Sequence, residues 1–418
     1  MTQYTALPIR PIGEHEYEDF YETIYTALDA AWPYEAEMAI NKRIIDFERT
    51  LAAFDGDRMV ATASSARVEM TVPAGSAPVA AVADIGVRHG WRRRGLMTAL
   101  MRRQLDDLRE RGESVAALYA SQAGIYGRYG YGQAGAEQTL TIPTATARLQ
   151  PRIPRDPSLR VTYSEIANDP EGQAAVREVY AALVAERPGL FPRHDGWWHQ
   201  VFVDPEHRRG PCAEKFLLLV RDEHGPRGYA LFAVGNSWNG ELPDNTATVH
   251  ELFARDAAAH AEIWEELLTR DLVARVEYVR RPADDPVLGI LADPRLVRSV
   301  RREGLWVRLV DVPGALTARG YAAPVDVTFE VTDDFAPWNA GVWRLTADAD
   351  GARCVRSGSP AELTLPVDVL GGAYLGGRGA ALTSAVAAGL VTEDRPGAVR
   401  RLALALAWDP APWCPHEF

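Results

Sequence analysis

Residues 88–95 place four arginines and two glycines in one short turn, ahead of a helix-like segment. The start of a helix carries unsatisfied N–H groups and a partial positive charge, so phosphate binds there favourably. Gly90 and Gly95 let the backbone approach a ligand, because no Cβ stands in the way. Arg92, Arg93 and Arg94 add positive charge in a chain whose formal net charge is −12. The turn therefore predicts a phosphate site, and a solvated basic turn is the alternative.

Three tyrosines follow in the glycine-rich stretch 120–132, at Tyr126, Tyr129 and Tyr131. A phenol with a pKa of about 10 can give a proton to a thiolate whose conjugate acid has a pKa of about 8.5, provided that it lies beside the sulfur. The residues alone leave two interpretations open. One tyrosine is an acid, or all three are packing aromatics in a tight turn.

The elements that must position these groups are readable around the turn. Residues 81–87 form an apolar run that predicts a strand. Residues 96–111 repeat apolar positions at the spacing of one helical face, and Gly112 stands where a left-handed cap ends a helix. Residues 115–120 predict the next strand. The basic turn thus links a strand to the start of a helix.

These motifs resemble the acyl-CoA site of the GNAT N-acetyltransferases, whose pattern is Gln/Arg-x-x-Gly-x-Gly/Ala. Here it is Arg92-x-x-Gly95-x-Met97, and Met97 departs from the pattern. The loop from Gly124 to Gly132, the chain length and the ending Glu417-Phe418 make the chain similar to the Eis (enhanced intracellular survival) branch of that superfamily. The resemblance extends over the whole chain and is weakest in the middle third.

The resemblance implies an α/β (α+β) fold with two tandem GNAT-like domains and a sterol-carrier-protein-like C-terminal domain. We expect the N-terminal GNAT domain with the acetyl-CoA site at 1–150, a central GNAT-like domain at 151–305, and the sterol-carrier-like domain at 306–418. The central domain repeats the strand–turn–helix order, but its turn is Ala254-Arg255-Asp256, without glycine or paired arginines. We therefore expect this copy to bind no CoA.

The implied function is acetyl transfer from acetyl-CoA to amines of a small cationic acceptor, such as an aminoglycoside, a polyamine or a lysine side chain. The resemblance makes Tyr126 the general acid and the C-terminal carboxylate of Phe418 the general base. A C-terminus is more commonly a solvated tail. Trp413, Cys414 and Phe418 are poor choices for such a tail, and two prolines stiffen it. A non-catalytic acyl-CoA-binding regulatory or scaffold protein is the alternative, although a pure binder needs no acid or base.

Further site residues follow from the same resemblance. The residues expected to bind the cosubstrate are Ile85, Gly86, Val87, Arg92, Arg93, Arg94, Gly95 and Leu96. The candidate anchors for a cationic acceptor are Trp32, Glu35, Asp84 and Glu417, and for each of them a plain surface or core role is the alternative. No metal is expected, and a homohexamer is implied.

Composition limits the other classes of function. An acidic chain lacks the clustered positive charge that nucleic-acid binding needs. Three distant cysteines, Cys212, Cys354 and Cys414, give neither a metal-ligand spacing nor a disulfide framework. We see no signal-peptide pattern and no membrane-length apolar run, so a cytoplasmic enzyme without a membrane partner is expected.

Several expected elements outside the turn test the domain plan. We expect a helix over 14–31 that ends before Pro33, a second helix near 41–49, and two strands at 58–65 and 67–72. Residues 138–142 alternate and predict the last strand of the first domain.

Overall fold

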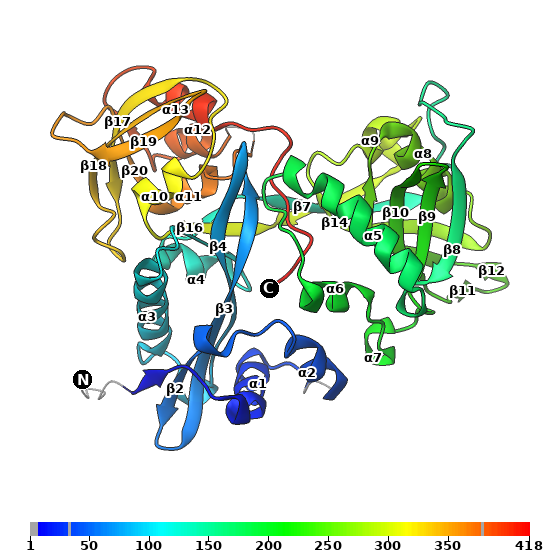
Figure 1. Cartoon of the computed structure of the whole chain (residues 1–418), viewed down its shortest axis with the longest axis horizontal. Helices are drawn as coiled ribbons and strands as arrows, with labels where there is room; N and C mark the ends of the chain where they lie inside the picture. Colours follow the sequence, from blue (N-terminus) through cyan, green and yellow to red (C-terminus); the bar gives the residue numbers. More distant parts are fainter. Residues whose placement is uncertain (1–6, 32–34, 378–379) are drawn as a thin grey trace. The chain divides into compact units, whose positions relative to one another are not determined.

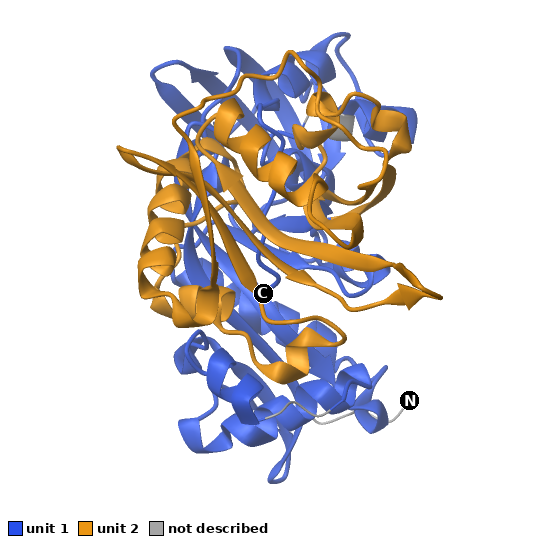
Figure 2. Cartoon of the chain, turned by 90° about the vertical axis from the view of Figure 1, so that its right-hand side faces the viewer, with its two compact units in different colours: residues 1–135, 304–418 blue, residues 136–303 orange. Residues whose placement is uncertain are grey.

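The computed structural model describes residues 7–31, 35–377 and 380–418. The chain divides into two compact units, residues 1–135 with 304–418 and residues 136–303 (Figure 2). The chain leaves the first unit after Gly135 and returns at Gly304, whose N–H donates to the Gly135 carbonyl over 3.1 Å. The second unit is therefore an insertion within the first.

The first unit contains a seven-stranded sheet that brings distant segments together (Figure 1). Its strands, in spatial order, are β1 (Ile9–Arg10), β2 (Leu51–Asp55), β3 (Arg58–Val72), β4 (Gly75–Val87), β5 (Val115–Tyr119), β16 (Leu305–Leu309) and β6 (Gly132–Gln133). Strand β4 is antiparallel to β3 and parallel to β5, and β16 is antiparallel to both of its neighbours. Residues near 305 therefore complete the sheet of the N-terminal domain.

Helices cover both faces of this sheet, because successive strand residues point to opposite sides. Ala52 and Phe54 of β2 pack with α1 (Tyr17–Leu28), whereas Leu51 and Ala53 pack with α3 (Leu96–Glu110). Two shorter helices, α2 (Glu35–Asn41) and α4 (Ala123–Tyr126), belong to the same domain. The two faces are called the α1 face and the α3 face below.

The second unit repeats this plan around its own core. The strand order is β15 (Arg298–Glu303), β7 (Ala136–Pro143), β14 (Val273–Pro282), β13 (Asn245–Ala254), β10 (Gly225–Val234), β9 (Phe216–Asp222) and β8 (Arg160–Glu165). Its helices are α5 (Pro170–Leu183), α6 (Asp195–Phe202), α7 (Glu206–Arg209), α8 (Ala257–Leu268) and α9 (Val287–Ile290), and β11 (Trp238–Asn239) with β12 (Leu242–Pro243) forms a hairpin.

The C-terminal part of the first unit forms a third sheet. The strand order is β19 (Gly351–Arg356), β18 (Gly341–Asp348), β17 (Val325–Thr332), β20 (Leu363–Pro366) and β21 (Thr392–Glu393). Its helices are α10 (Val312–Thr317), α11 (Val367–Ala373), α12 (Ala380–Ala387) and α13 (Ala398–Leu406). Helix α11 packs on β16 and β6, so this domain lies directly against the N-terminal sheet.

The expected helix over 96–111 and the left-handed Gly112 are confirmed. Others were wrong. Helix α1 ends at Leu28, because Asp29 adopts a left-handed conformation with φ 54° well before Pro33. No helix spans 41–49, where α2 ends and a 3-10 turn over Phe47–Arg49 is capped by the Asp46 carboxylate. The strands expected at 58–65 and 67–72 are the single strand β3.

The expected last strand of the first domain was also wrong. Residues 138–142 lie in β7, which pairs with β14 and β15 of the second unit. Local alternation predicted the strand correctly but carried no information about its partners, since pairing between distant segments depends on the whole fold. Among the residues that the structure describes, none of the helices is long and apolar enough to cross a membrane.

Candidate active site

Strands β4 and β5 separate in the middle of the first sheet. Their parallel pairing covers only Val79–Ala81 opposite Val115–Ala117. Strand β4 then continues to Val87, and that stretch of its edge has no partner strand on the β5 side among the described residues. The separation leaves backbone groups of one strand edge available to an extended ligand, as in strand addition.

The basic turn lies at the end of this free edge. Arg93 has φ 60° and Gly95 has φ 86°, so the backbone before α3 is left-handed at both positions. The N–H of Ala99 makes the first bond of the helix, to the Gly95 carbonyl at 2.9 Å, and α3 has no side-chain cap within the described chain. The N–H groups of the first turn therefore point toward the exposed turn, where an anion would satisfy them.

Arg92 braces this turn. Its Nε donates to the Val87 carbonyl over 3.1 Å, and its guanidinium also donates to the Ala27 carbonyl at the end of α1. Gly86 allows α1 and β4 to approach closely, because a Cβ there would lie 2.9 Å from the Ala27 Cβ. Arg92 thus holds the end of β4 against α1, while the side chains of Arg93 and Arg94 are exposed on the turn.

Tyr126 ends the short helix α4 just beyond β5. Its ring is 5% exposed and belongs to the core cluster on the α3 face, edge-on to Tyr131 with ring centroids 6.1 Å apart. Burial raises the pKa of the Tyr126 phenol, and a hydrogen bond with Ser121 acts in the opposite direction. The group is therefore a protonated hydroxyl at neutral pH. Sequence reasoning missed Ser121, which no spacing pattern singled out.

The C-terminal tail is packed rather than solvated. It runs from α13 toward the first sheet (Figure 1), and Cys414 is 1% exposed. The Tyr119 hydroxyl at the end of β5 donates to the Cys414 carbonyl over 2.6 Å. The Phe418 ring is half-buried and lies edge-on to Tyr119, with centroids 5.7 Å apart. The last residue of the chain therefore lies against the strand end from which the Tyr126 loop begins.

Asp84 lies at a β-bulge in β4. The register with β3 changes between Thr62 opposite Gly86 and Ser64 opposite Ala83, and Asp84 itself has φ 55°. The extra residue reverses the alternation, so Asp84 turns to the α1 face although Val82 packs on the α3 face. There the Ser64 hydroxyl donates to the carboxylate over 2.6 Å, a partner that sequence reasoning missed.

The Asp84 carboxyl is half-buried and forms no ion pair with a cation among the described residues. Burial raises its pKa, and the Ser64 hydrogen bond offsets part of that rise. The charge also raises the pKa of the Tyr17 and Tyr21 phenols on α1, whose larger cause is burial. A partly buried carboxylate without a counter-charge, beside aromatic rings, is a favourable place for an ammonium group.

The remaining predicted residues have varied positions. Ile85 and Val87 are half-buried on the free stretch of β4, and Leu96 is buried in the core beneath α3. Glu35 begins α2 and is exposed, and Glu417 is exposed in the tail. Trp32 lies outside the described residues. Asp84 and the basic turn thus lie on β4 and at its end, whereas Tyr126 and the tail lie at the end of β5. Asp84 faces α1 and Tyr126 packs on the α3 face, so the two are on opposite faces of the sheet, and Glu35 lies on a separate short helix.

The second unit has the same strand–turn–helix order, but its equivalent site is filled by its own side chains. The Asp256 carboxylate accepts from the N–H groups of Ala258 and Ala259 and so caps α8. The buried Arg281 guanidinium donates to the Leu252 carbonyl on β13 over 3.4 Å. A phosphate would meet a carboxylate at this helix start. The start of α3, by contrast, has no side-chain cap within the described chain.

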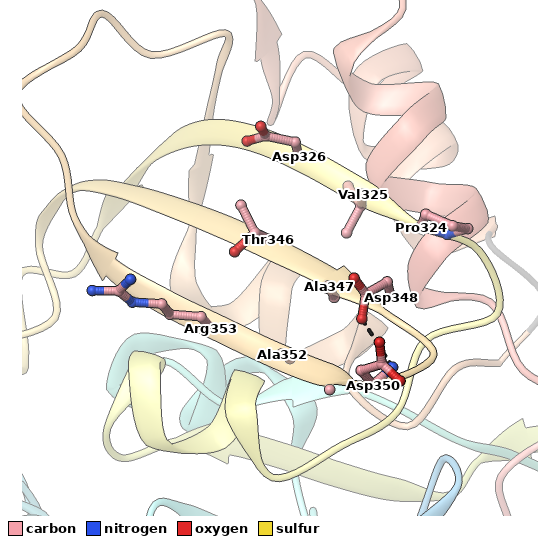
Figure 3. A pocket seen from close by; sticks show the side chains of 10 residues that line it. Pro324, Val325, Asp326, Thr346, Ala347, Asp348, Asp350, Ala352 and Arg353 are labelled. Carbon is pink, nitrogen blue, oxygen red and sulfur yellow. Dashed lines mark hydrogen bonds between the residues drawn. The ribbon is translucent and has the colours of Figure 1, made fainter.

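A separate hollow of about 690 Å³ lies on the third sheet (Figure 3). Strands β17, β18 and β19 line it, and its carboxylates are Asp326, Asp348 and Asp350. Asp326 is already paired with Arg344, and the Asp350 N–H donates to Asp348 over 2.9 Å. None of the predicted site residues lies there. In the described part of the chain, no cluster of His, Cys, Asp and Glu is arranged to hold a metal ion.

Comparison with known proteins assigns three domains to the chain. Residues 8–134 match the family described as acetyltransferase (GNAT) domain, residues 189–309 match a second family of that description, and residues 312–415 match the sterol carrier protein domain. The fold class is therefore confirmed, and the ranges 1–150, 151–305 and 306–418 stay a prediction.

Relatives match over most or all of the chain. An uncharacterized N-acetyltransferase of Streptomyces avermitilis is 39% identical and covers 98% of this chain and 99% of its own. N-acetyltransferase Eis of Mycobacterium tuberculosis is 33% identical and covers 85% of this chain and 84% of its own. The crystal structure of Eis1 from Mycobacterium abscessus has a TM-score of 0.83 at 31% identity and covers 98% of this chain and 100% of its own. With its uncapped α3, free β4 edge and two GNAT domains, this chain belongs to the Eis-like branch of the GNAT N-acetyltransferases and is an acetyl-CoA-dependent acyltransferase.

Proposed function

We propose that this N-acetyltransferase acts on a primary amine of a small cationic acceptor, with Tyr126 as general acid and the Phe418 carboxylate as general base. The observation that carries the proposal is the packed C-terminus. The Phe418 ring lies against Tyr119, and the Tyr119 hydroxyl binds the tail backbone at Cys414. A chain end fixed at the end of β5 is otherwise difficult to explain, since termini are usually loose.

The proposed reaction balances in three steps. The nitrogen of the neutral amine attacks the thioester carbonyl carbon and, as the C–N bond forms, gives one proton to the Phe418 carboxylate. The C–S bond breaks, and the Tyr126 hydroxyl donates its proton to the departing sulfur, leaving an acetylated amine and a CoA thiol. The phenolate and the carboxylic acid then exchange a proton with solvent. Backbone groups of Ile85 and Val87 would hold the pantetheine arm, and the first turn of α3 with Arg93 and Arg94 would hold the phosphates.

The acceptor side of the proposal rests on charge. Asp84 is half-buried and has no cationic partner in the described chain. An ammonium group would offset the cost of ionising that carboxyl. Glu417 follows the packed tail, and Glu35 and Trp32 belong to the same N-terminal region. Aminoglycosides, polyamines and lysine side chains all present such an amine, and the named relatives are N-acetyltransferases.

Compartment and assembly are part of the same proposal. The three cysteines are free thiols, which fits a reducing cytoplasm. We also propose a homohexamer that acts on a small molecule and binds neither nucleic acid nor membrane. Sedimentation at low protein concentration checks the assembly, and a monomer there would contradict it.

Replacing Tyr126 by Phe tests the general acid. Turnover should fall by about 10²–10⁴, the usual contribution of a positioned acid, whereas the affinity for acetyl-CoA should stay within about twofold. Thiol release over a panel of amines measures turnover, and calorimetry measures acetyl-CoA binding. Tyr129→Phe is the matched control in the same loop. A Tyr126→Phe enzyme with near-normal turnover would remove Tyr126 from the mechanism.

Extending the chain by one glycine after Phe418 tests the general base. The added residue moves the carboxylate by about 3.5 Å, so transfer should fall by at least about 10² while the melting temperature changes little. An extension at the N-terminus is the control. Full activity with the extended C-terminus would show that another group accepts the amine proton.

A further inference from the structure

A short loop of the third domain packs against the N-terminal domain next to the Tyr126 loop. We call residues 333–339, between β17 and β18, the hook. The Asn339 amide donates to the carbonyls of Leu309 and Val310 over 3.1 and 3.2 Å, and the Trp338 indole donates to Val310 over 2.8 Å. The hook is therefore hydrogen-bonded to the end of β16, the strand that completes the first sheet.

The hook also packs on the α3 face. The Phe335 ring lies edge-on to Tyr129, with centroids 4.9 Å apart. The Arg102 guanidinium of α3 lies 4.0 Å above the Phe335 ring and donates to the Phe335 carbonyl. Arg109 lies 4.7 Å above the Trp338 ring. Phe335 of the hook is thus held by Arg102 of α3 on one side and contacts Tyr129 of the Tyr126 loop on the other.

The centre of this contact is a buried ion pair. Arg308 of β16 is 0% exposed, and its Nη2 donates to the Asp333 carboxylate over 2.6 Å. Asp333 also accepts from the Ala336 N–H and from the Asn339 amide, which orders the hook around it. The other two nitrogens of Arg308 have no hydrogen-bond partner among the described residues. Burial raises the pKa of the Asp368 carboxyl on α11, and the Arg308 charge offsets part of that rise.

Arg308 lies directly beneath the loop that carries Tyr126. Gly130 has φ 81°, and a Cβ there would lie 2.2 Å from Arg308 Nη1. The next residue, Tyr131, donates its N–H to the Tyr126 carbonyl over 3.3 Å and packs its ring against Tyr126. Its buried hydroxyl, near Arg308, has no partner in the described chain. The guanidinium is thus linked to Tyr126 through Gly130, which lies beside it, and Tyr131, whose ring packs on Tyr126.

We propose that Arg308, held by Asp333 of the hook, is a positioning residue for the Tyr126 phenol. The sterol-carrier-like domain then sets the geometry of the acid loop, in addition to supplying the tail. The inference rests on the proposed role of Tyr126. The link runs through Tyr131, whose ring packs edge-on to Tyr126 and whose phenol pKa is raised by burial and lowered, to a smaller extent, by the Arg308 charge.

The ordinary alternative is that Arg308 and Asp333 only join two domains. A double variant, Arg308→Met with Asp333→Asn, separates the two, because it leaves neither member of the pair charged and so limits the loss of stability. The matched control is Arg193→Met with Glu251→Gln, which removes a buried arginine–glutamate pair in the second unit. Both doubles are compared with the wild type in the full-length chain.

We expect kcat of the Arg308/Asp333 double to fall by on the order of 10–100-fold, with KM for acetyl-CoA within about twofold, because loop geometry and not cosubstrate binding changes. The Arg193/Glu251 double should keep kcat within about twofold. Phe335→Ala removes the packing of the hook on Tyr129 but leaves the ion pair intact, and its kcat should also fall with KM for acetyl-CoA unchanged.

The outcomes separate cleanly. If Tyr126→Phe turns over normally, the proposed function fails and this inference fails with it. If Tyr126→Phe is slow but the Arg308/Asp333 double and Phe335→Ala both keep normal kcat, only the positioning role is overturned. A double that does not fold leaves Phe335→Ala and Arg308→Lys to decide. Normal kcat in both of these folded variants overturns the proposal.

Discussion

At the scale of single residues, Asp84 combines features that seldom occur together. It has a left-handed backbone, lies at a bulge, and carries a half-buried carboxylate without a cationic partner in the described chain. Each feature is unfavourable for folding, and such positions concentrate at functional sites. The sequence predicted Asp84 as a candidate anchor, but strict alternation would have turned it to the α3 face. The bulge that turns it toward α1 leaves no signature in a single sequence.

Replacing Asp84 by Asn should stabilise the protein. The folded state raises the pKa of this carboxyl, so the unfolded state ionises first as the pH rises and stability decreases across that interval. Asparagine removes this penalty and tolerates left-handed φ, so the free energy of unfolding at pH 7 should rise by on the order of 1 kcal/mol.

The gain should shrink as the pH falls below about 4, where the carboxyl is protonated in both states. Urea denaturation at several pH values measures it. Asp57→Asn, on the exposed turn before β3, is the control and should change little. A pH-independent gain would mean that the backbone conformation, and not the charge, is the cause.

At the scale of elements, helices α3 and α8 show how one strand–turn–helix order gives an uncapped helix in one copy and a capped helix in the other. Both follow a strand and a short turn. Gly95 before α3 leaves the first N–H groups open, whereas the Asp256 carboxylate before α8 occupies them. This difference could be predicted from the sequence, because the residue before α3 is a glycine, whereas the residue before α8 is an aspartate that can cap the helix. The filling of the second site by Arg281 could not, because it depends on a side chain from a different strand.

Placing a carboxylate before α3 should imitate the capped start of α8. Gly95→Asp and Gly95→Asn have the same shape and the same strain at φ 86°, but only the aspartate carries charge. KM for acetyl-CoA should be at least about tenfold higher in the Asp variant than in the Asn variant, which corresponds to about 1.4 kcal/mol.

The difference should diminish at high salt, because exposed charges are screened. Steady-state kinetics at two ionic strengths measure both effects. Equal KM values for the two variants would indicate that phosphates bind elsewhere.

At the scale of the whole molecule, the arrangement is one unit inserted into another. Gly135 and Gly304 are joined by a hydrogen bond, and β16 (Leu305–Leu309) completes a sheet whose first strand begins at Ile9. Composition, helix α3 and the order of domains were predictable, because they follow from local periodicity and from family motifs. The pairing of β7 within the second sheet and of β16 within the first sheet was not predictable, since the residue pattern of either strand suits either sheet. The hook was missed because its partners in β16, α3 and the Tyr126 loop are distant in sequence.

The insertion predicts how the protein can be cut. A chain with residues 1–135 joined to 304–418 by a short glycine–serine linker should fold cooperatively and bind acetyl-CoA, because all of its sheet partners are present. Residues 1–150 alone should not, since β5 and β6 would lack β16 between them. Circular dichroism melting and calorimetry with acetyl-CoA measure both fragments. A fragment 1–150 with a sharp melting transition would contradict the role given to β16.

The position of β16 also orders events during synthesis. A ribosome releases the first 135 residues well before residue 309 exists, at about 5–20 residues per second. For on the order of ten to thirty seconds the nascent N-terminal sheet has an open gap beside β5, with backbone groups that can pair with a foreign strand. The inserted unit, which holds all of its own strands, can fold in that interval, so we expect chaperone dependence to arise from the flanking half of the chain.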